Sequence, residues 1–426
     1  MRFLFTTFEG GGHVPPALLM ARTLQQRGHE VLVVSDPANA LAAQAAGLAF
    51  TPWRTAPRRL ATAQVDDPLQ DWRRRWPPAV VRAVCRAVMT GPALDYARDT
   101  RDLIQAFDPD LIVSNELLLG CLLAAEAGAR PVALLTGNLW PYPTRPDLPP
   151  FGPGWAPPRT ERARRAHDYG RGLIGRWFDA GLPALNAARA EFGLAPLDAV
   201  LDQLDAAQGI VLGASRAFDY GLQPPQGYVH AGALIDFPPA PPETSAPGSR
   251  PKVLISFSTT FQNQTAVMAR CLRALAPLPV DVIATTGPAV DPRDLPCPAN
   301  AQVTPWADHD RLVPECSLVI CHGGHGTLLR PLRHGVPVLC LPMGRDHPEN
   351  GRRLVEHGAG LMARKGAPPR RLRALALRLL DDARYARAAD RLGKRILADQ
   401  PQERAAGVAA LEGLTVRSEG SVARAA

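Results

Sequence analysis

The two halves of this 426-residue chain begin with the same pattern, in which an apolar run rich in β-branched or aromatic residues leads through a loop into helically spaced apolar residues. This pattern predicts alternating strands and helices, which pack as parallel sheets covered by helices. The expected elements are strands over residues 2–7, 29–35, 252–258 and 280–285 and helices over 17–26 and 265–275. Because ligands bind such sheets at the carboxyl ends of the strands, we expect a cleft there.

A proline-rich segment separates the two halves. Residues 236–250, DFPPAPPETSAPGSR, hold few large apolar side chains and are predicted to form a linker. The length of the chain suits two domains. We therefore expect an α/β protein with two Rossmann-like parallel-sheet domains, residues 1–235 and 251–395, followed by a C-terminal helix and a frayed tail over residues 396–426.

The composition excludes several classes of protein. Hydrophobic residues make up 46% of the chain and charged residues 21%, which is typical of a water-soluble globular protein. No apolar run approaches membrane-spanning length, and the apolar N-terminus ends at Glu9 and three glycines, unlike a signal peptide. Seven scattered cysteines lack metal-ligand spacing and fit reduced thiols, so we expect a cytoplasmic protein without a metal site.

The net charge of +8 is the difference between 48 basic and 40 acidic residues. Arginines cluster over residues 54–86 and 159–176. Since no nucleic-acid-reading motif accompanies them, we do not expect nucleic acid as a partner. The clusters form either solvated helix faces or a surface that attracts an acidic or membrane-associated acceptor. We expect no stable membrane insertion, and a monomer or a homodimer.

A glycine-rich turn in the second half has the character of an anion site. A short apolar strand over residues 318–321 leads directly into His322-Gly-Gly-His-Gly-Thr327 and then into an apolar-periodic helix. Glycines let the backbone approach a phosphate, and the first N–H groups of the helix point at it with the positive end of the helix dipole. The turn matches neither the dinucleotide-binding nor the P-loop pattern, which disfavours those two functions.

Further motifs stand at fixed distances from this turn. They are Trp306, His334-Gly-Val-Pro337, the segment PMGRDHPEN over residues 342–350 and the N-terminal GGGHVPP over residues 10–16. Their order and spacing resemble the glycosyltransferase family that includes plant and mammalian glucosyl- and glucuronosyltransferases and bacterial macrolide and antibiotic glycosyltransferases. The resemblance covers nearly the whole chain. It implies the GT-B fold, with two Rossmann-like domains facing a central cleft, and no cofactor beyond a nucleotide-sugar donor.

The resemblance also implies which residues bind the donor. The indole face of Trp306 and the backbone of Ala307 would hold the base, although a tryptophan here could instead belong to a core. Thr259 would add a hydroxyl, and Asp346-His347 would bind the sugar where the family usually has Asp-Gln. The residues expected to cradle the diphosphate are His322, Gly324, Gly326 and Thr327, and Gly12 and Gly323 are also expected to bind the donor.

Two departures from the family pattern concern specificity. His347 replaces a glutamine and changes which sugar hydroxyl is favoured. Arg330 occupies the position where many members place a glutamate that binds the ribose hydroxyls. The loss of that glutamate suits a deoxyribose donor, so both UDP- and dTDP-sugars stay open as donors.

The resemblance implies that His13 is the general base, and its place directly after the first strand should make it face the cleft. A neutral histidine can take the proton of an acceptor hydroxyl as its oxygen attacks the anomeric carbon, so an inverting, metal-independent transfer is expected. We interpret Asp108-Pro-Asp110 as turn residues at the amino end of the following strand, not as a metal site.

The family's usual carboxylate partner of this histidine is missing. Alignment on DPDLIVSNE places Asn115 there, and an amide cannot offset an imidazolium charge. Glu116 is adjacent, yet neighbours on a strand face opposite ways, so Glu116 could replace the carboxylate only if the backbone shifts locally. We therefore keep His13, Asn115 and Glu116 as the catalytic candidates.

The leading hypothesis is a hexosyltransferase that acts on a small aromatic or polyketide-like natural product, as in antibiotic biosynthesis. A loop over residues 140–158, dense in proline, glycine and aromatic residues, forms either an acceptor pocket or a plain surface connection. The alternatives are a GT-B UDP-sugar 2-epimerase, a cell-wall-type lipid-sugar transferase on the membrane, and a catalytically degenerate protein that binds a nucleotide-sugar or a partner enzyme.

Overall fold

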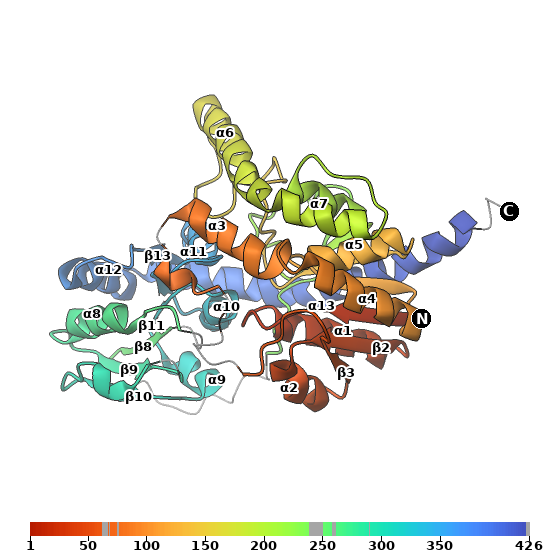
Figure 1. Cartoon of the computed structure of the whole chain (residues 1–426). Coiled ribbons are helices and arrows are strands. Elements are labelled where there is room, and N and C mark those ends of the chain that lie inside the picture. The colour runs from red at the N-terminus through yellow and green to blue at the C-terminus, as the bar shows by residue number, and fades with distance from the viewer. Residues whose placement is uncertain are drawn as a thin grey trace.

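The computed structural model describes residues 1–61, 67, 69–74, 76–237, 250–257, 261–288 and 290–422. Within this part of the chain two parallel sheets form the centres of two domains, which lie side by side in Figure 1. The first sheet has 7 strands in the order β3-β2-β1-β4-β5-β6-β7, and the second has 6 strands in the order β10-β9-β8-β11-β12-β13. The predicted α/β class with two parallel-sheet domains is confirmed.

In the first domain the strands alternate with helices that cover the sheet. The strands are β1 (Arg2–Thr6), β2 (Glu30–Ser35), β3 (Ala49–Pro52), β4 (Leu111–Asn115), β5 (Val132–Thr136), β6 (Gly209–Leu212) and β7 (Tyr228–His230). The helices are α1 (Val14–Gln26), α2 (Ala40–Ala45), α3 (Pro77–Val84), α4 (Ala93–Phe107), α5 (Leu119–Ala127), α6 (Glu161–Phe178) and α7 (Leu182–Glu191). Because β1 pairs in parallel with β4, with Thr6 opposite Ser114, the loops after both strands meet at one edge.

The second domain repeats this arrangement. Its strands are β8 (Lys252–Ser256), β9 (Asp281–Thr285), β10 (Ala301–Thr304), β11 (Leu318–Cys321), β12 (Val338–Cys340) and β13 (Gly360–Met362). Its helices are α8 (Thr265–Leu275), α9 (His309–Leu312), α10 (His325–Arg333), α11 (His347–Glu356) and α12 (Pro369–Asp381). Strand β11 is buried along its whole length and ends at the glycine turn, so the turn is delivered to the carboxyl edge of this sheet.

The last helix, α13 (Ala383–Val422), packs on both domains. It lies against α10 near its start and against β6 and β7 further along. Near its end, Glu412 accepts hydrogen bonds from Arg27 (Nε, 2.8 Å) and pairs with His29 (Nε2, 2.8 Å) of the first domain. The boundary expected at residue 396 falls inside this helix, and residues 423–426 of the expected tail lie outside the described residues.

Several element boundaries differ from expectation for simple reasons. Helix α1 begins at Val14, before the predicted residue 17, because prolines fit the first turn of a helix, where no N–H is needed. Residues 161–191 hold two helices, α6 and α7, which are separated by a short 3-10 turn, Asp179–Gly181. Most of the expected linker lies outside the described residues, since only residues 236, 237 and 250 are described there.

Helix α6 projects from the body of the first domain in Figure 1 and carries the second arginine cluster. Glu161 forms ion pairs with Arg164 and Arg165 one turn further along, and all three side chains are largely exposed. This arrangement is that of a solvated helix face. Of the helices in the described ranges, none is both long and apolar enough to cross a membrane.

Candidate active site

His13 is the residue that caps the start of α1, and it meets both candidate partners from the end of β4. Asn115 Nδ2 lies 3.3 Å from His13 Nδ1, and Glu116 Oε1 lies 3.6 Å from the same nitrogen. Strand β4 ends at Asn115, so Glu116 belongs to a turn and no longer follows the strand's alternation. The structure therefore brings together all three predicted catalytic candidates.

The amide of Asn115 has a fixed orientation. Its Oδ1 accepts the N–H of Leu117 at 3.0 Å, and its Nδ2 donates to Glu116 Oε2 at 2.8 Å. The NH₂ group, a donor without acceptor capacity, is consequently the part that faces His13. Asn115 thus disfavours a proton on His13 Nδ1, whereas an ionised Glu116 would accept one.

Burial controls the charge of this group of side chains. The side chain of His13 is 26% exposed, while that of Glu116 is only 3% exposed. Burial raises the pKa of Glu116 to about 8, because the charged carboxylate is desolvated. Burial also lowers the pKa of His13 to about 4, so that His13 is neutral near pH 7.

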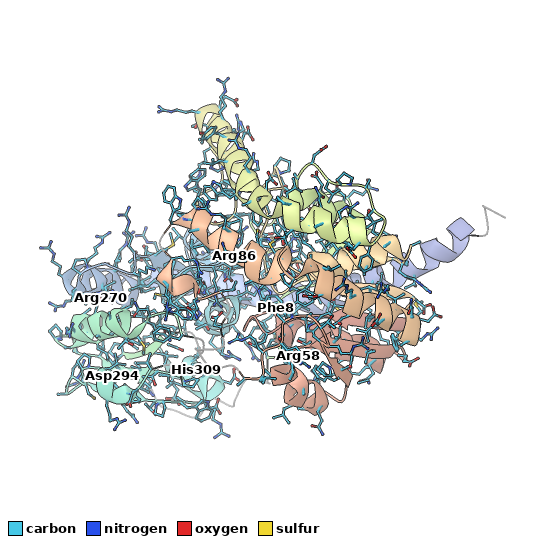
Figure 2. All side chains as sticks on the ribbon, in the orientation of Figure 1. Phe8, Arg58, Arg86, Arg270, Asp294 and His309 are labelled. Carbon is cyan, nitrogen blue, oxygen red and sulfur yellow. The ribbon has the colours of Figure 1, made fainter. Side chains whose placement is uncertain are left out.

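Small residues leave room for the His13 ring. The ring stacks on Phe8, with centroids 5.5 Å apart, and a Cβ at Gly10 would lie 2.9 Å from both rings. Gly137, after β5, lies on the other side, where a Cβ would be 3.2 Å from the carbonyl oxygen of Gly12. Figure 2 labels Phe8 near the middle of the molecule.

The HGGHGT turn connects β11 to α10 as the sequence predicts. Gly323 has φ +94°, and a Cβ there would lie 2.5 Å from Cys340 Sγ, so only glycine fits. Gly324 is the N-cap of α10, and a Cβ on it would overlap the ring of His322. The first backbone bond of α10 runs from Leu328 N to Gly324 O (2.9 Å), which leaves the N–H groups of residues 325–327 available to an anion.

His322 and His347 pack together beneath this turn. Their ring centroids are 4.6 Å apart, and both residues are at most 5% exposed. Burial lowers the pKa of His347 to about 3, and that of His322 well below its ordinary value. His347 Nδ1 accepts the N–H of Met343 at 3.4 Å, so its proton sits on Nε2 and the ring can only donate to a sugar hydroxyl.

Asp346 is held from both domains. Its Oδ2 accepts from Asn350 Nδ2 of α11 at 2.7 Å and from Asn138 Nδ2 of the first domain at 2.7 Å. Its Oδ1 approaches His347 Nε2 at 3.8 Å, outside hydrogen-bond range. One carboxylate oxygen is therefore fixed by an amide donor from each domain. Asn350 belongs to the predicted motif over residues 342–350, whereas no local pattern marks Asn138.

Trp306 is 74% exposed, which excludes the core position considered as its alternative. With Ala307 it lines a pocket of about 310 Å³ next to α9, whose first residue, His309, is labelled in Figure 2. The other residues that line the pocket are Ile283, Gln302, Thr304, Asp308, Arg311, Leu312 and Glu315. Thr259, also predicted to bind the donor, lies outside the described residues.

Arg330, at the position where many family members have a glutamate, forms an ion pair with Asp310. Its Nε donates to Asp310 Oδ1 at 2.7 Å, and both side chains are partly exposed, at 26% and 33%. Arg330 is thus paired with a carboxylate of the neighbouring helix α9.

Arg345 belongs to the same motif over residues 342–350, and its contacts give it a role that the motif did not indicate. It has φ +54° and extends across to the first domain, where its Nε donates to Asp71 Oδ2 at 2.9 Å and its Nη2 to Asp67 Oδ2 at 3.4 Å. Its positive charge contributes to the lowered pKa of His13, His322 and His347. Arg345 therefore lies near the centre of the candidate site.

Asp108 and Asp110 occupy the opposite edge of the first sheet. Asp110 Oδ2 accepts the backbone N–H of Arg2 at 2.7 Å, and Asp108 pairs with the side chains of Arg2 and Arg130, each at 2.6 Å. This agrees with their interpretation as turn residues. Within the described ranges, no group of three or more His, Cys, Asp or Glu side chains is arranged to hold a metal ion.

The chain is similar to several known proteins. Residues 269–411 match the family model described as "Erythromycin biosynthesis protein CIII-like, C-terminal domain". The chain is 26% identical to 4'-demethylrebeccamycin synthase of Lentzea aerocolonigenes over 412 residues, which cover 92% of this chain and 94% of that protein.

Solved structures share the whole architecture. The glycotransferase of kitacinnamycin has a TM-score of 0.72 at 20% identity, covering 95% of this chain and 97% of its own. The glycosyltransferase VinC, solved in complex with dTDP, has a TM-score of 0.65 at 20% identity, covering 98% of this chain and 100% of its own. The expected two-domain arrangement is confirmed by these structures.

Proposed function

We propose that this chain, a GT-B glycosyltransferase, transfers a sugar from a UDP- or dTDP-sugar to a small aromatic or polyketide-like natural product, with inversion at the anomeric carbon and without a metal ion. The observation that carries the proposal is the Asn138–Asp346 hydrogen bond of 2.7 Å. It joins the two sites across one cleft, with His13 on the first domain and the HGGHGT turn on the second.

In the proposed reaction, the acceptor oxygen forms a bond to the anomeric carbon while the bond from that carbon to the diphosphate breaks. His13 Nε2 takes the proton of the acceptor hydroxyl, a contribution typically worth about 10² to 10⁴ in rate. The electron pair of the broken bond goes to the diphosphate. The N–H groups at the start of α10 would stabilise the negative charge that develops there.

His13 can act as this base only when its ring proton sits on Nδ1. Glu116 Oε1, 3.6 Å away, is the acceptor that favours this tautomer when it is ionised, whereas the NH₂ group of Asn115, 3.3 Å away, favours the other. An ionised Glu116 would also stabilise the imidazolium that forms. We therefore assign Glu116 the role that the family gives to an aspartate, with Asn115 fixing the carboxylate in place.

Of the two nucleotides, the side chains at the ribose position favour dTDP. Arg330 carries five N–H donors and no acceptor, so it cannot accept a hydrogen bond from a ribose 2'-hydroxyl as a glutamate would. Asp310 partly offsets this loss, but it is already bonded to Arg330 at 2.7 Å. VinC, which matches this chain over its whole length, was solved with dTDP.

The acceptor class follows from the relatives and from the loop over residues 140–158. The name of one relative refers to rebeccamycin, and that of the matching family model refers to erythromycin. We infer that this chain transfers a sugar to a product of the same kind. The loop starts beside the proposed catalytic residues, because Tyr142 Oη donates to the carbonyl oxygen of Glu116 at 2.7 Å.

All seven cysteines are free thiols, which fits an enzyme of the reducing cytoplasm.

The test is to incubate the purified protein with a panel of UDP- and dTDP-sugars and of phenolic and polyketide acceptors, and to identify products by mass spectrometry and NMR. We expect a glycoside of inverted anomeric configuration, formed equally well in EDTA and lost in His13→Ala. Undiminished turnover by His13→Ala would refute the catalytic assignment. Conversion of a UDP-sugar to its 2-epimer would favour the epimerase alternative, and donor binding without any product the degenerate binding protein.

A further inference from the structure

Helix α11 carries Asp346-His347 at its start and, one turn on, holds a loop of the first domain. Glu349 Oε1 accepts two backbone hydrogen bonds from that loop, from Gly152 N at 2.9 Å and from Gly154 N at 2.7 Å. Glu349 is 1% exposed. A buried carboxylate that accepts two N–H groups from the other domain makes a strong, directional contact.

The loop backbone lies directly on the helix at this point. Gly154 has φ +64°, and a Cβ on it would lie 2.7 Å from the carbonyl oxygen of Pro348. Arg352 Nε of α11 donates to the carbonyl oxygen of Gly154 at 3.0 Å, so both polar groups of this glycine are engaged. The fit therefore requires glycine at position 154 for both its conformation and its size.

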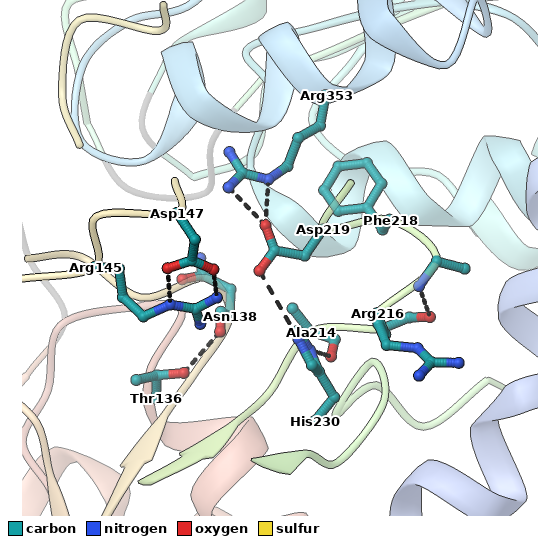
Figure 3. A network of polar contacts seen from close by, with 12 residues as sticks. Thr136, Asn138, Arg145, Asp147, Ala214, Arg216, Phe218, Asp219, His230 and Arg353 are labelled. Atoms are coloured by element: carbon teal, nitrogen blue, oxygen red, sulfur yellow. Dashed lines mark hydrogen bonds and ion pairs between the residues drawn. The ribbon is translucent and has the colours of Figure 1, made fainter. Parts of the chain in front are cut away.

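The second oxygen of Glu349 faces Arg353, whose buried ion pair with Asp219 is shown in Figure 3. Arg353 Nη1 lies 3.5 Å from Glu349 Oε2, and Arg353 also forms two contacts with Asp219 Oδ1 of the first domain, from Nε at 2.8 Å and from Nη2 at 2.6 Å. Tyr220 covers the guanidinium at 4.3 Å. The close partner of Arg353 is Asp219, whereas Glu349 lies 3.5 Å from Arg353. The hydrogen bonds of Glu349 to the loop, at 2.9 and 2.7 Å, are shorter than that contact.

The segment that connects β5 to α6 contains this loop, and it contacts the candidate site at one end and α6 at the other. Asn138 donates to Asp346 at 2.7 Å, and Tyr142 donates to the Glu116 carbonyl. Beyond Gly154, the ring of Trp155 stacks on His167 of α6, with centroids 5.3 Å apart. The loop thus runs from the catalytic group to the projecting helix and is held on α11 on the way.

We propose that Glu349 is a positioning residue. Its two hydrogen bonds to Gly152 and Gly154, which we call the latch, hold the loop on α11, the helix proposed to bind the sugar. The donor sugar and the acceptor-side loop are thereby fixed relative to each other. The inference rests on the proposed function in that the loop faces the acceptor. The latch itself is a property of the ligand-free chain and can be tested without substrate.

The first experiment measures hydrogen–deuterium exchange of peptides that cover residues 150–156 in the full-length protein without ligand. We expect Glu349→Ala to exchange at least about tenfold faster there, because two hydrogen bonds to a charged group are lost. Gly154→Ala should do the same from the loop side without changing any charge. Glu349→Gln keeps an oxygen for both N–H groups and should stay near the wild-type rate.

A matched control is Asp390→Ala, which removes an exposed carboxylate paired with Lys394 on α13 and should change nothing in the loop. If Glu349 served mainly as a counter-ion of Arg353, Gln would be as damaging as Ala and Gly154→Ala would be harmless. That pattern would overturn the proposal, as would unchanged exchange in both alanine variants.

The second experiment measures kinetics with an acceptor that the panel described under the proposed function shows to be turned over. We expect Glu349→Ala and Gly154→Ala to raise the KM for the acceptor several-fold while the Kd of dTDP, measured by calorimetry, stays unchanged. An unchanged acceptor KM despite faster exchange would overturn the coupling between loop and acceptor. An enzyme that turned over no acceptor would contradict the proposed function, and the exchange experiment would still decide on the latch.

Discussion

Asn138, two residues beyond the end of β5, donates its Nδ2 hydrogen to Oδ2 of Asp346 in the second domain over 2.7 Å. Asn350 donates to the same oxygen from within α11, also at 2.7 Å. The carboxylate proposed to bind the sugar is therefore oriented from both domains at once. Its subsite is complete only while the two domains face each other as they do here.

The first prediction is that Asn138→Ala lowers kcat/KM for the nucleotide-sugar roughly tenfold, since a hydrogen bond to a charged group typically contributes about 1.5–3 kcal/mol. The Kd of the free nucleotide diphosphate, which lacks the sugar, should be unchanged in a calorimetric titration. An equal loss of affinity for both ligands would mean that Asn138 acts on the whole cleft and not on the sugar subsite.

The second prediction concerns the pH dependence of the reaction. Because burial raises the pKa of Glu116 to about 8, the wild-type kcat/KM for the acceptor should rise as the pH increases through about 8, where Glu116 ionises and the proton of His13 moves to Nδ1. In Glu116→Gln this inflection should disappear and activity above pH 8 should fall. The same acceptor is used for both enzymes, so that its own ionisation cancels. An inflection that survived in the variant would show that another group controls it.

The third prediction uses the family's own residue at the neighbouring position. Asn115→Asp replaces the NH₂ group that faces His13 Nδ1 at 3.3 Å with an acceptor of similar shape. We expect higher activity than wild type below pH 8, where Glu116 is protonated, and a smaller change above it. Initial rates at matched pH values test this, and equal or lower activity throughout would contradict the tautomer argument.

The fourth prediction is a stability effect with a defined sign. The folded protein binds a proton at Glu116 up to about pH 8, whereas the unfolded chain releases it near the ordinary pKa of a glutamate. The folded state therefore holds more protons between these values, and its stability falls as the pH rises through that window. Glu116→Gln should remove this loss, so its Tm should exceed that of the wild type at pH 9 and match it more closely at pH 5. Differential scanning calorimetry at the two pH values is the measurement.

The fifth prediction concerns the buried ion pair between the domains. Asp219→Ala leaves the guanidinium of Arg353, 3% exposed, with Glu349 at 3.5 Å as its remaining charged neighbour among the described residues. We expect a loss of about 3 kcal/mol in the free energy of unfolding, because removing one partner leaves a buried charge poorly compensated. The paired change Asp219→Ala with Arg353→Met should lose less. Urea denaturation of the three proteins compares them.

The chain's local patterns determined the elements of both sheets and the glycine turn before α10. Strand β11 and helix α8 have the bounds that the sequence predicts, because alternation of apolar strands with helically spaced residues is a local property. The fit of Gly323 is local in the same sense, since its φ of +94° is a requirement of the turn itself. The predictions of the GT-B fold and of a glycosyltransferase rested on such short motifs, and both are confirmed.

Only the tertiary structure determined the contacts between segments that lie far apart in the chain. Asn138 and Asp346 are 208 residues apart, and Gly152 and Glu349 are 197 apart, so no local pattern could mark either pair. The partner of His13 depended on where β4 ends, because one residue beyond the strand the alternation of side chains stops and Glu116 can turn inward beside Asn115. The sequence by itself therefore determined the two half-sites, and the packing of one domain on the other determined which side chains complete them.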